Sequence, residues 1–270
     1  MDFLNTIDKL QEATIQSSNT TKKDEGYKYD KLRMYFGEDF VYKNIVISMP
    51  TIGDILEIGE ENFFESLTPF LYNSTSIRVM LWDKGIDWNK VKDIEVFDLM
   101  NATTKNKDGL KLIFKNIDID EYKLISVKDI NTDESNFCLY NPIYDFYITE
   151  EDYLVIANYI REILDMHPKV EKAKGKTAKS WIIQEEKMNM NQKEKKDRFT
   201  LLPLVSSCVN HPGFKYKLKE LKDMGIYQFM DSVKRIQKYE SGISALRGCY
   251  SGFVDSSKID KELINFMGEI

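Results

Sequence analysis

The residues best suited to chemistry are the two histidines, and they fall into no catalytic spacing. His167 and His211 each precede a proline and lie in different segments of the chain. A metal site or a nucleophilic triad would need the fold to bring them together with acids. The chain also has no G-x-S-x-G nucleophile elbow. We therefore predict two turn histidines, and no catalytic, cofactor-binding or metal-binding residue.

Two stretches match known ligand-binding motifs only in part. Residues 174–177 read K-G-K-T, like the end of a phosphate-binding loop, but Val170 stands where that loop needs its first glycine. Residues 129–133 begin like a calcium loop, but its sixth position is Glu134 and its twelfth is Tyr140. We predict neither nucleotide binding nor calcium binding, and we interpret the second motif as a polar hairpin tip.

The cysteines and the N-terminus indicate the compartment. Cys138, Cys208 and Cys249 are widely spaced and form no C-x-x-C pair, so we interpret them as buried or unreactive thiols. No run of 18 uncharged apolar residues suggests a membrane span, and the first residues lack the basic start and apolar stretch of a signal peptide. The expected compartment is a cytoplasm.

The N-terminal and C-terminal parts of the chain differ in net charge. Residues 1–168 carry 18 Lys and Arg against 31 Asp and Glu, whereas residues 169–270 carry 20 against 13. This polarity suits head-to-tail docking or a charged partner, and two differently composed solvated surfaces are the alternative. The basic run 169–198 has one aromatic residue, Trp181, and interleaved acids, so a connecting helix is favoured over nucleic-acid binding.

Apolar periodicity predicts the elements before residue 110. A strand is expected over 40–49, and Pro50 ends it. Thr51 and Asp54 have the spacing of a capping box, which predicts a helix start there. Further helices are expected up to residue 103, and a polar turn over 105–109.

Residues 110–148 alternate with period two, which predicts three or four short strands joined by turns. Thr149 and the three acids after it predict the start of a helix that ends by His167. The predicted class is therefore α+β, with a mostly antiparallel sheet, formed by strand 40–49 and the strands of 110–148, covered by helices. An all-α region follows.

The predicted organisation has four segments. An N-terminal arm spans 1–34, an α+β domain 35–168, a basic linker and helix 169–198, and a helical domain 199–270. In the last segment, short helices are expected, broken at Pro203, residues 211–213, Gly225, Gly242 and Gly248. An apolar stripe is expected to pack against 201–205 and 263–267, with Phe229 in the core; its members are Ile226, Phe229, Met230, Val233 and Ile236.

Two groups of motifs resemble a known class of proteins. The first comprises I-S-M-P-T-I-G-D-I-L-E-I-G-E-E-N-F-F (47–64) and R-V-M-L-W-D-K-G-I-D-W (78–88). The second comprises N-H-P-G-F-K-Y (210–216), Y-Q-F-M-D-S-V-K-R-I-Q-K (227–238), G-C-Y-S-G-F-V-D (248–255) and I-N-F-M-G-E-I (264–270). Together these stretches resemble tail and baseplate proteins, hub or hub-assembly components, of long-tailed bacteriophages of Gram-positive bacteria.

The resemblance implies a non-enzymatic structural subunit of a phage tail or baseplate. Such a protein would be assembled in the bacterial host cytoplasm, reside in the virion and associate in several copies with other tail or baseplate proteins. Its expected partner-binding anchors are Trp82, Trp88 and Trp181, for each of which a place in the core is the alternative. A tail-assembly chaperone absent from the mature particle is a second interpretation. A hydrolase using scattered acids and a histidine is a third, from another class.

Overall fold

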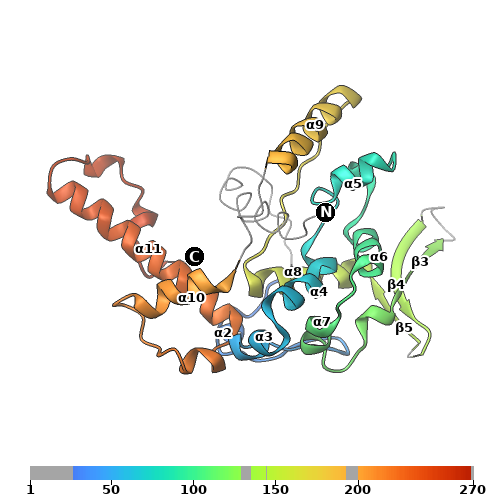
Figure 1. Cartoon of the computed structure of the whole chain (residues 1–270), viewed down its shortest axis with the longest axis horizontal. Coiled ribbons are helices and arrows are strands. Elements are labelled where there is room, and N and C mark those ends of the chain that lie inside the picture. The colour runs from blue at the N-terminus through green and yellow to red at the C-terminus, as the bar shows by residue number, and fades with distance from the viewer. Residues whose placement is uncertain (1–26, 129–134, 144, 193–199, 269–270) are drawn as a thin grey trace.

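The protein is an α+β structure in which small antiparallel sheets lie in the N-terminal half. The computed structural model describes residues 27–128, 135–143, 145–192 and 200–268 (Figure 1). Helices pack around the sheets, and residues 200–250 are helical apart from connecting turns. This confirms the predicted class and the predicted all-helical C-terminal region.

The N-terminal hairpin replaces the single strand expected over 40–49. Strand β1 (Phe40–Tyr42) pairs antiparallel with β2 (Ile45–Ile47), and Phe40 lies opposite Ile47. The turn between them begins at Lys43, whose φ is +51°. The prediction of one strand was wrong because no glycine or proline marks this turn in an otherwise β-rich run.

Helices α3 (Ile52–Ile58) and α4 (Glu60–Leu71) follow the hairpin. The predicted capping box is confirmed: the Thr51 hydroxyl accepts from the Asp54 N–H, and the Asp54 carboxylate accepts from the Thr51 N–H. Gly59, at φ +91°, separates the two helices. Pro69 lies inside α4, which ends two residues later at Leu71.

Three shorter helices complete this region. They are α5 (Arg78–Asp83), α6 (Asp93–Thr103) and α7 (Asp108–Ile113). Helix α7 lies where a turn and a strand were predicted, so the prediction for those residues was wrong. Buried Leu110 and Ile113 are three residues apart, a spacing that places both on one face of a helix but on opposite faces of a strand.

The second sheet has the order β3 (Lys123–Lys128), β4 (Ser135–Asn141), β5 (Phe146–Thr149), with antiparallel neighbours. The antiparallel strands predicted before Thr149 are confirmed. The expectation that strand 40–49 joins them in one sheet was wrong. The segment after α7 lies along β2 instead: the Ser48 N–H donates to the Ile113 carbonyl (2.8 Å) and the Lys115 N–H to the Val46 carbonyl (3.4 Å).

Helix α8 (Glu150–Leu164) runs through the centre and contacts α4, α6 and α11. Thr149 caps it and three acids follow in its first turn, as predicted; Thr149 and Asp152 also form a capping box. Buried Arg161 donates to the carbonyls of Phe70 (2.8 Å) and Tyr72 (3.1 Å) and pairs with Asp93 at 3.0 Å. The guanidinium therefore satisfies carbonyls at the end of α4 that the helix leaves without partners.

Helix α9 (Lys176–Gln192) packs against α5. The Arg78 guanidinium pairs with Glu171 and Glu186, and Lys179 pairs with Asp87 at 2.6 Å. Ile183 is also buried, and Ile182 and Met190 pack partly buried against the core. Apolar side chains and a set of ion pairs therefore fix α9.

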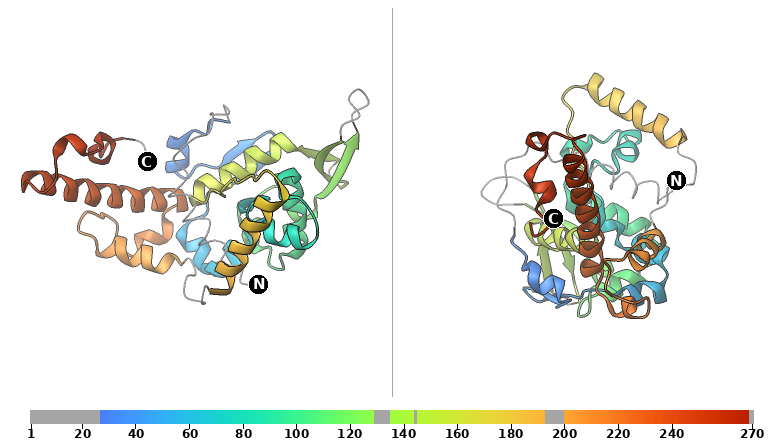
Figure 2. Two further views of the ribbon diagram at one scale, coloured as in Figure 1. Left: turned by 90° about the horizontal axis from the view of Figure 1, so that it is seen from above. Right: turned by 90° about the vertical axis from the view of Figure 1, so that its left-hand side faces the viewer.

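The C-terminal region contains α10 (Leu201–Asn210), a 3-10 helix η3 (Glu220–Asp223) and the long helix α11 (Ile226–Tyr250). Two further 3-10 helices, η4 (Ser256–Lys258) and η5 (Lys261–Ile264), fold back along α11 (Figures 1 and 2). The predicted breaks at Pro203, Gly242 and Gly248 were wrong, because Pro203 lies in the first turn of α10 and both glycines lie inside α11. A Cβ on Gly242 would lie 2.7 Å from the Leu263 carbonyl oxygen, so close packing explains that glycine.

One hydrophobic cluster includes residues from both sides of the predicted boundary near residue 170. Backbone hydrogen bonds also cross it: Ile52 N–H donates to the Met224 carbonyl (3.0 Å) and Ile226 N–H to the Pro50 carbonyl (2.9 Å). The division into four segments stays a prediction. Among the helices described, none is long and apolar enough to cross a membrane.

Candidate partner-binding site

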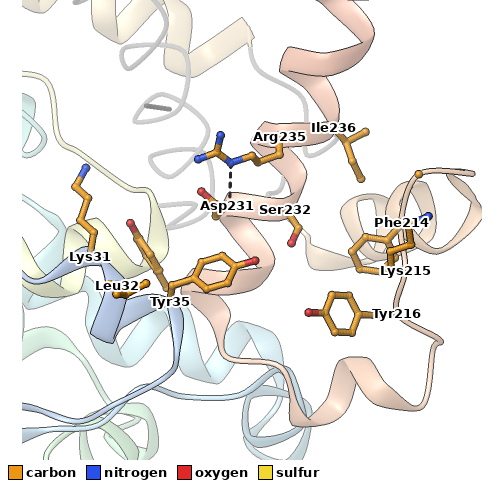
Figure 3. Close-up of a pocket in the computed structure, with 12 residues that line it drawn as sticks. Lys31, Leu32, Tyr35, Phe214, Lys215, Tyr216, Asp231, Ser232, Arg235 and Ile236 are labelled. Carbon is orange, nitrogen blue, oxygen red and sulfur yellow. Dashed lines mark ion pairs between the residues drawn. The ribbon is translucent and has the colours of Figure 1, made fainter. Parts of the chain in front are cut away.

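A pocket of about 560 Å³ lies where the N-terminal helix α2 (Lys31–Tyr35) meets the base of α11 (Figure 3). The loop 213–216 forms its third wall. The residues that line it are Lys31, Leu32, Tyr35, Gly213, Phe214, Lys215, Tyr216, Tyr227, Asp231, Ser232, Arg235 and Ile236. Its volume is in the range of pockets that accept small ligands or large side chains.

Helix α2 is anchored so that one side faces the pocket. Asp30 caps it by accepting from the Leu32 and Arg33 N–H groups, and Met34 is buried beneath it. Lys31 pairs with Glu162 of α8 at 3.4 Å. Leu32 is 67% exposed at the edge of the pocket, so this apolar side chain is available to a partner.

The loop 213–216 is held by His211. The His211 Nδ1 accepts from the Gly213 N–H at 3.1 Å, so Nε2 carries the ring proton and donates to Glu240 at 3.0 Å. The rings of Phe214 and Tyr216 lie 5.6 Å apart and are tilted. His211 therefore positions the aromatic wall of the pocket.

The pocket combines aromatic rings with an excess of positive charge. The charged residues of its lining are three cations, Lys31, Lys215 and Arg235, and one acid, Asp231, which pairs with Arg235 at 3.5 Å (Figure 3). Burial raises the pKa of Tyr227 to about 12, and the nearby acids Glu162, Asp231 and Asp165 add to this effect. Its phenol therefore keeps its proton near neutral pH. Among the described lining residues there is no histidine or cysteine, so the arrangement favours binding of an aromatic group accompanied by carboxylates.

The three predicted tryptophan anchors lie away from this pocket. Trp88 is buried, and its indole N–H donates to the Glu171 carbonyl at 3.1 Å. Trp82 is half-buried with its ring centre 6.1 Å from that of Trp88. Trp181 is 70% exposed on α9. The fold therefore leaves Trp181 as the candidate that faces solvent, while the other two pack together.

The other residues considered for chemistry are dispersed. His167 is exposed beyond the end of α8, and its Nε2 lies 3.5 Å from a carboxylate oxygen of Glu162. Of residues 174–177, the last two are the first residues of α9. Cys138 and Cys208 are buried, and burial raises the pKa of both thiols. Among the described residues, no group of three His, Cys, Asp or Glu side chains could hold a metal ion. The calcium-like stretch 129–133 lies outside the described residues.

A second feature is the far end of α11, here called the arm tip and defined as residues 248–258. Tyr250 is 85% exposed and Phe253 is 91% exposed. The turn that presents them is ordered: Gly252 has φ +75°, and the Phe253 and Val254 N–H groups donate to the Gly248 carbonyl at 3.0 and 3.1 Å. Sequence reasoning missed both the pocket and the arm tip. The letters Y-S-G-F-V-D could have signalled the tip, since two aromatic residues flank a glycine-containing turn.

Part of the chain matches a known protein family. Residues 191–270 match the family model described as the YomV second domain. This match is consistent with a phage-related protein and does not distinguish a tail or baseplate component from other phage proteins. The matched segment includes the arm tip and all pocket residues from loop 213–216 and α11, but not those from α2. No curated protein and no solved structure matches the chain.

Proposed function

We propose that the protein is a non-enzymatic structural subunit of a bacteriophage tail or baseplate, acting by protein–protein association while the virion is assembled. The family match supports the phage context. The observation that carries the proposal is the arm, α11 with its returning tail, which projects from the body (Figure 2). Exposed aromatic side chains lie at the tip of this arm.

Large apolar side chains at such exposure are unfavourable in water unless a partner covers them. Tyrosine and other aromatic residues are frequent hot spots in interfaces. Leu32, at the edge of the pocket, and Phe36, at the C-terminal end of α2, are 67% and 73% exposed and add a second exposed apolar area. A subunit with two separate apolar surfaces on a fixed framework can bridge neighbours in an assembly. The expected partners are other tail or baseplate proteins, and the expected location is the virion.

Mass spectrometry of purified particles tests the proposal. We expect the chain to be present in several copies per particle. Its presence in the infected cell together with absence from particles would contradict a structural subunit and support the assembly-chaperone interpretation.

Two matched variants test which surface makes the contact. We expect Tyr250→Ala/Phe253→Ala to fold normally and to lose incorporation into particles, because both side chains are exposed. Trp181→Ala is the competing variant, because Trp181 is the predicted anchor that stays exposed on α9, and it should be incorporated normally if the arm tip makes the contact. Loss of incorporation in that variant alone would instead favour α9 as the contact surface.

A further inference from the structure

We propose that the pocket between α2 and α11, together with the basic loop that continues from it, binds a short acidic segment of another protein that carries an aromatic residue. The basic loop is defined here as residues 215–222. This inference rests on the proposed function for the existence of partner proteins, and it identifies the chemistry of the segment that the pocket accepts. It concerns a different surface from the arm tip.

The basic loop carries four lysines without an acidic partner. Their side chains are exposed, and none forms an ion pair within the part of the chain that the structure describes; they are Lys215, Lys217, Lys219 and Lys222. The loop holds one acid, Glu220, whose carboxylate accepts from the Lys217 N–H at 2.8 Å. Four unpaired cations on one loop attract an anionic partner.

Two of the cations in the pocket lining are already neutralised. Lys31 pairs with Glu162 at 3.4 Å, and Arg235 pairs with Asp231 at 3.5 Å. Lys215 is the remaining cation of the lining, and it is also the first residue of the basic loop (Figure 3). The attraction for an anion therefore comes from the loop and begins where the loop meets the pocket.

The pocket supplies the aromatic part of the site. Tyr35 of α2 lines one wall, and Phe214 and Tyr216 line the wall formed by the loop (Figure 3). The ring centres of Phe214 and Tyr216 are 5.6 Å apart, and the volume of about 560 Å³ is large enough to enclose one aromatic side chain. An incoming ring can contact these rings in an offset or edge-to-face arrangement. Exposed Leu32 extends the apolar surface at the edge of the pocket.

The loop is held in place before any partner binds. The Gln228 side chain of α11 donates to the Tyr216 hydroxyl at 3.1 Å, and His211 Nδ1 accepts from the Gly213 N–H at 3.1 Å. Leu221 is buried near the end of the loop. Binding therefore requires little ordering of the backbone, which lowers its entropic cost.

The spacing of the lysines limits where the acids of the partner must lie. A chain spans at most about 3.6 Å per residue, so the Cα atoms of Lys217 and Lys219 lie within about 7 and 14 Å of that of Lys215. The same limit applies to the partner segment. Its acids are therefore expected within about four residues of the aromatic residue that enters the pocket.

A short acidic peptide agrees with these observations better than a nucleic acid does. The pocket offers one enclosed place for a ring, rather than a row of stacking platforms along a groove. The whole chain has a net charge of −6, which repels a long polyanion, whereas a short segment meets the basic loop alone. The arm tip of a second copy does not have the required charge either, because residues 248–258 carry one acid and one cation.

Binding of a defined peptide to the full-length chain tests this site. The probe is the peptide G-E-D-E-F-E-D-E-G with fluorescein at its N-terminus. Binding is followed by fluorescence anisotropy up to about 200 μM protein, because small interfaces bind weakly. One control probe replaces the phenylalanine by alanine and so removes the ring. The other replaces every acid by its amide and so removes the charge.

Three variants accompany the wild-type protein. The loop variant is Lys215→Glu/Lys217→Glu. Its matched control is Lys172→Glu/Lys174→Glu, which reverses two exposed lysines at the same spacing outside the pocket lining. The ring variant is Tyr216→Ala. Because all of these positions are exposed, the variants should fold, and circular dichroism verifies that each keeps the wild-type helix content.

We expect the wild type and the matched control to bind the probe equally. The loop variant and the ring variant should each bind at least about tenfold more weakly, as is usual for residues that dominate an interface. Both control probes should lose affinity for the wild type to a similar extent. Raising the NaCl concentration from about 0.05 to 0.5 M should weaken binding, because salt screens exposed charges.

The proposal is overturned if the wild type does not bind the probe, if the loop or ring variant binds as the wild type does, or if the matched control loses affinity equally. Single-stranded oligothymidylate that binds the wild type more tightly than the probe would instead assign the loop to nucleic acid. A wild-type molar mass that rises with concentration in light scattering, and does not rise in the loop variant, would assign the site to a second copy.

These outcomes are independent of the particle analysis. A chain that is present in virions but does not bind the probe would leave the proposed function standing and remove the acidic segment as the occupant of the pocket.

Discussion

Phe229 is the side chain that ties the C-terminal stripe to the rest of the protein. It is fully buried, as the stripe predicted, together with Ile226, Met230 and Val233. The stripe packs toward α8 and α10, whereas the tail residues Leu263 and Met267 are 36% and 94% exposed. The predicted burial of Phe229 is therefore confirmed, but the tail packs against a different stretch of α11.

Truncating this ring should destabilise the protein strongly. We expect Phe229→Ala to lower the free energy of unfolding by about 3–5 kcal/mol, because the surroundings of a buried ring collapse only partly into the space left. Urea denaturation followed by circular dichroism measures this. Phe253→Ala, at an exposed ring, is the control and should change the free energy by no more than about 0.5 kcal/mol. Equal stability of the two variants would contradict the core position of Phe229.

Asp118 makes the stability of the folded state depend on pH. A hydrogen bond with Asp120, followed by burial and the charges of Asp120 and Glu121, raises the pKa of Asp118 to about 6 from its ordinary value of 3.8. The folded state therefore holds this proton more tightly than the unfolded state. The resulting stabilisation is complete below about pH 4 and is lost as the pH rises through about 6.

We expect Asp118→Asn to resemble the protonated side chain. Its stability relative to wild type should be unchanged near pH 4 and should increase above pH 6, by on the order of 1 kcal/mol after allowance for solvent screening. Thermal melts across this pH range measure the difference. Glu185→Gln, at an exposed position of α9, controls for net charge, and a similar pH dependence in that variant would assign the effect to overall charge.

Helix α11 shows how an element can depend on a segment that follows it. Gly242 and Gly248 lie within its 25 residues, although glycine lowers helix stability by about 1 kcal/mol relative to alanine. The returning tail explains Gly242, because the Leu263 carbonyl and the Phe266 ring approach its Cα. Arg235 also donates to the carbonyls of Phe266 (3.2 Å) and Gly268 (3.1 Å).

Gly242→Ala should therefore release the tail, even though alanine favours the helix. The added methyl would lie 2.7 Å from the Leu263 oxygen, and such overpacking costs about 1–3 kcal/mol. Limited trypsin digestion followed by mass spectrometry should show faster cleavage after Lys258 or Lys261 than in wild type. Ser241→Ala, at the exposed neighbouring position, should cleave at the wild-type rate. Faster digestion of both variants would indicate a general effect on the helix.

The whole molecule has one continuous core that crosses residue 170. Met224 and Ile226 are buried in the same cluster as Met49 and Ile52, and the chain also forms an isolated bridge between Thr51 and Gly225. Helix α11 contacts α8 and α2 at its base. The matched family segment is therefore connected to the preceding residues by packing and by backbone hydrogen bonds.

We expect the full chain to unfold in a single cooperative transition. In differential scanning calorimetry, the calorimetric enthalpy should equal the van't Hoff enthalpy, which is the test of two-state behaviour. Near-ultraviolet circular dichroism of the aromatic residues and far-ultraviolet circular dichroism of the helices should give the same midpoint. Two resolved transitions would instead support the predicted division into independent domains.

Local patterns in the sequence predicted the structure correctly where a few neighbouring residues determine the backbone conformation. Thr51 and Thr149 both cap their helices as predicted, and each does so with a carboxylate three residues further along. The apolar stripe of α11 likewise required only helical spacing. The α+β class followed from the same local periodicities.

Contacts between distant segments were needed where two local structures were equally compatible with the residues. Residues 110–113 alternate like a strand, but they form α7, in which Gly109 closely approaches α4; a Cβ there would lie 2.9 Å from the Phe63 carbonyl oxygen. The pocket combines residues about 200 positions apart, from α2 and α11, and no local pattern encodes that distance. Burial of Trp88 and exposure of Trp181 were also unpredictable, because a tryptophan suits a core or an interface equally, and its neighbours in space decide which it occupies.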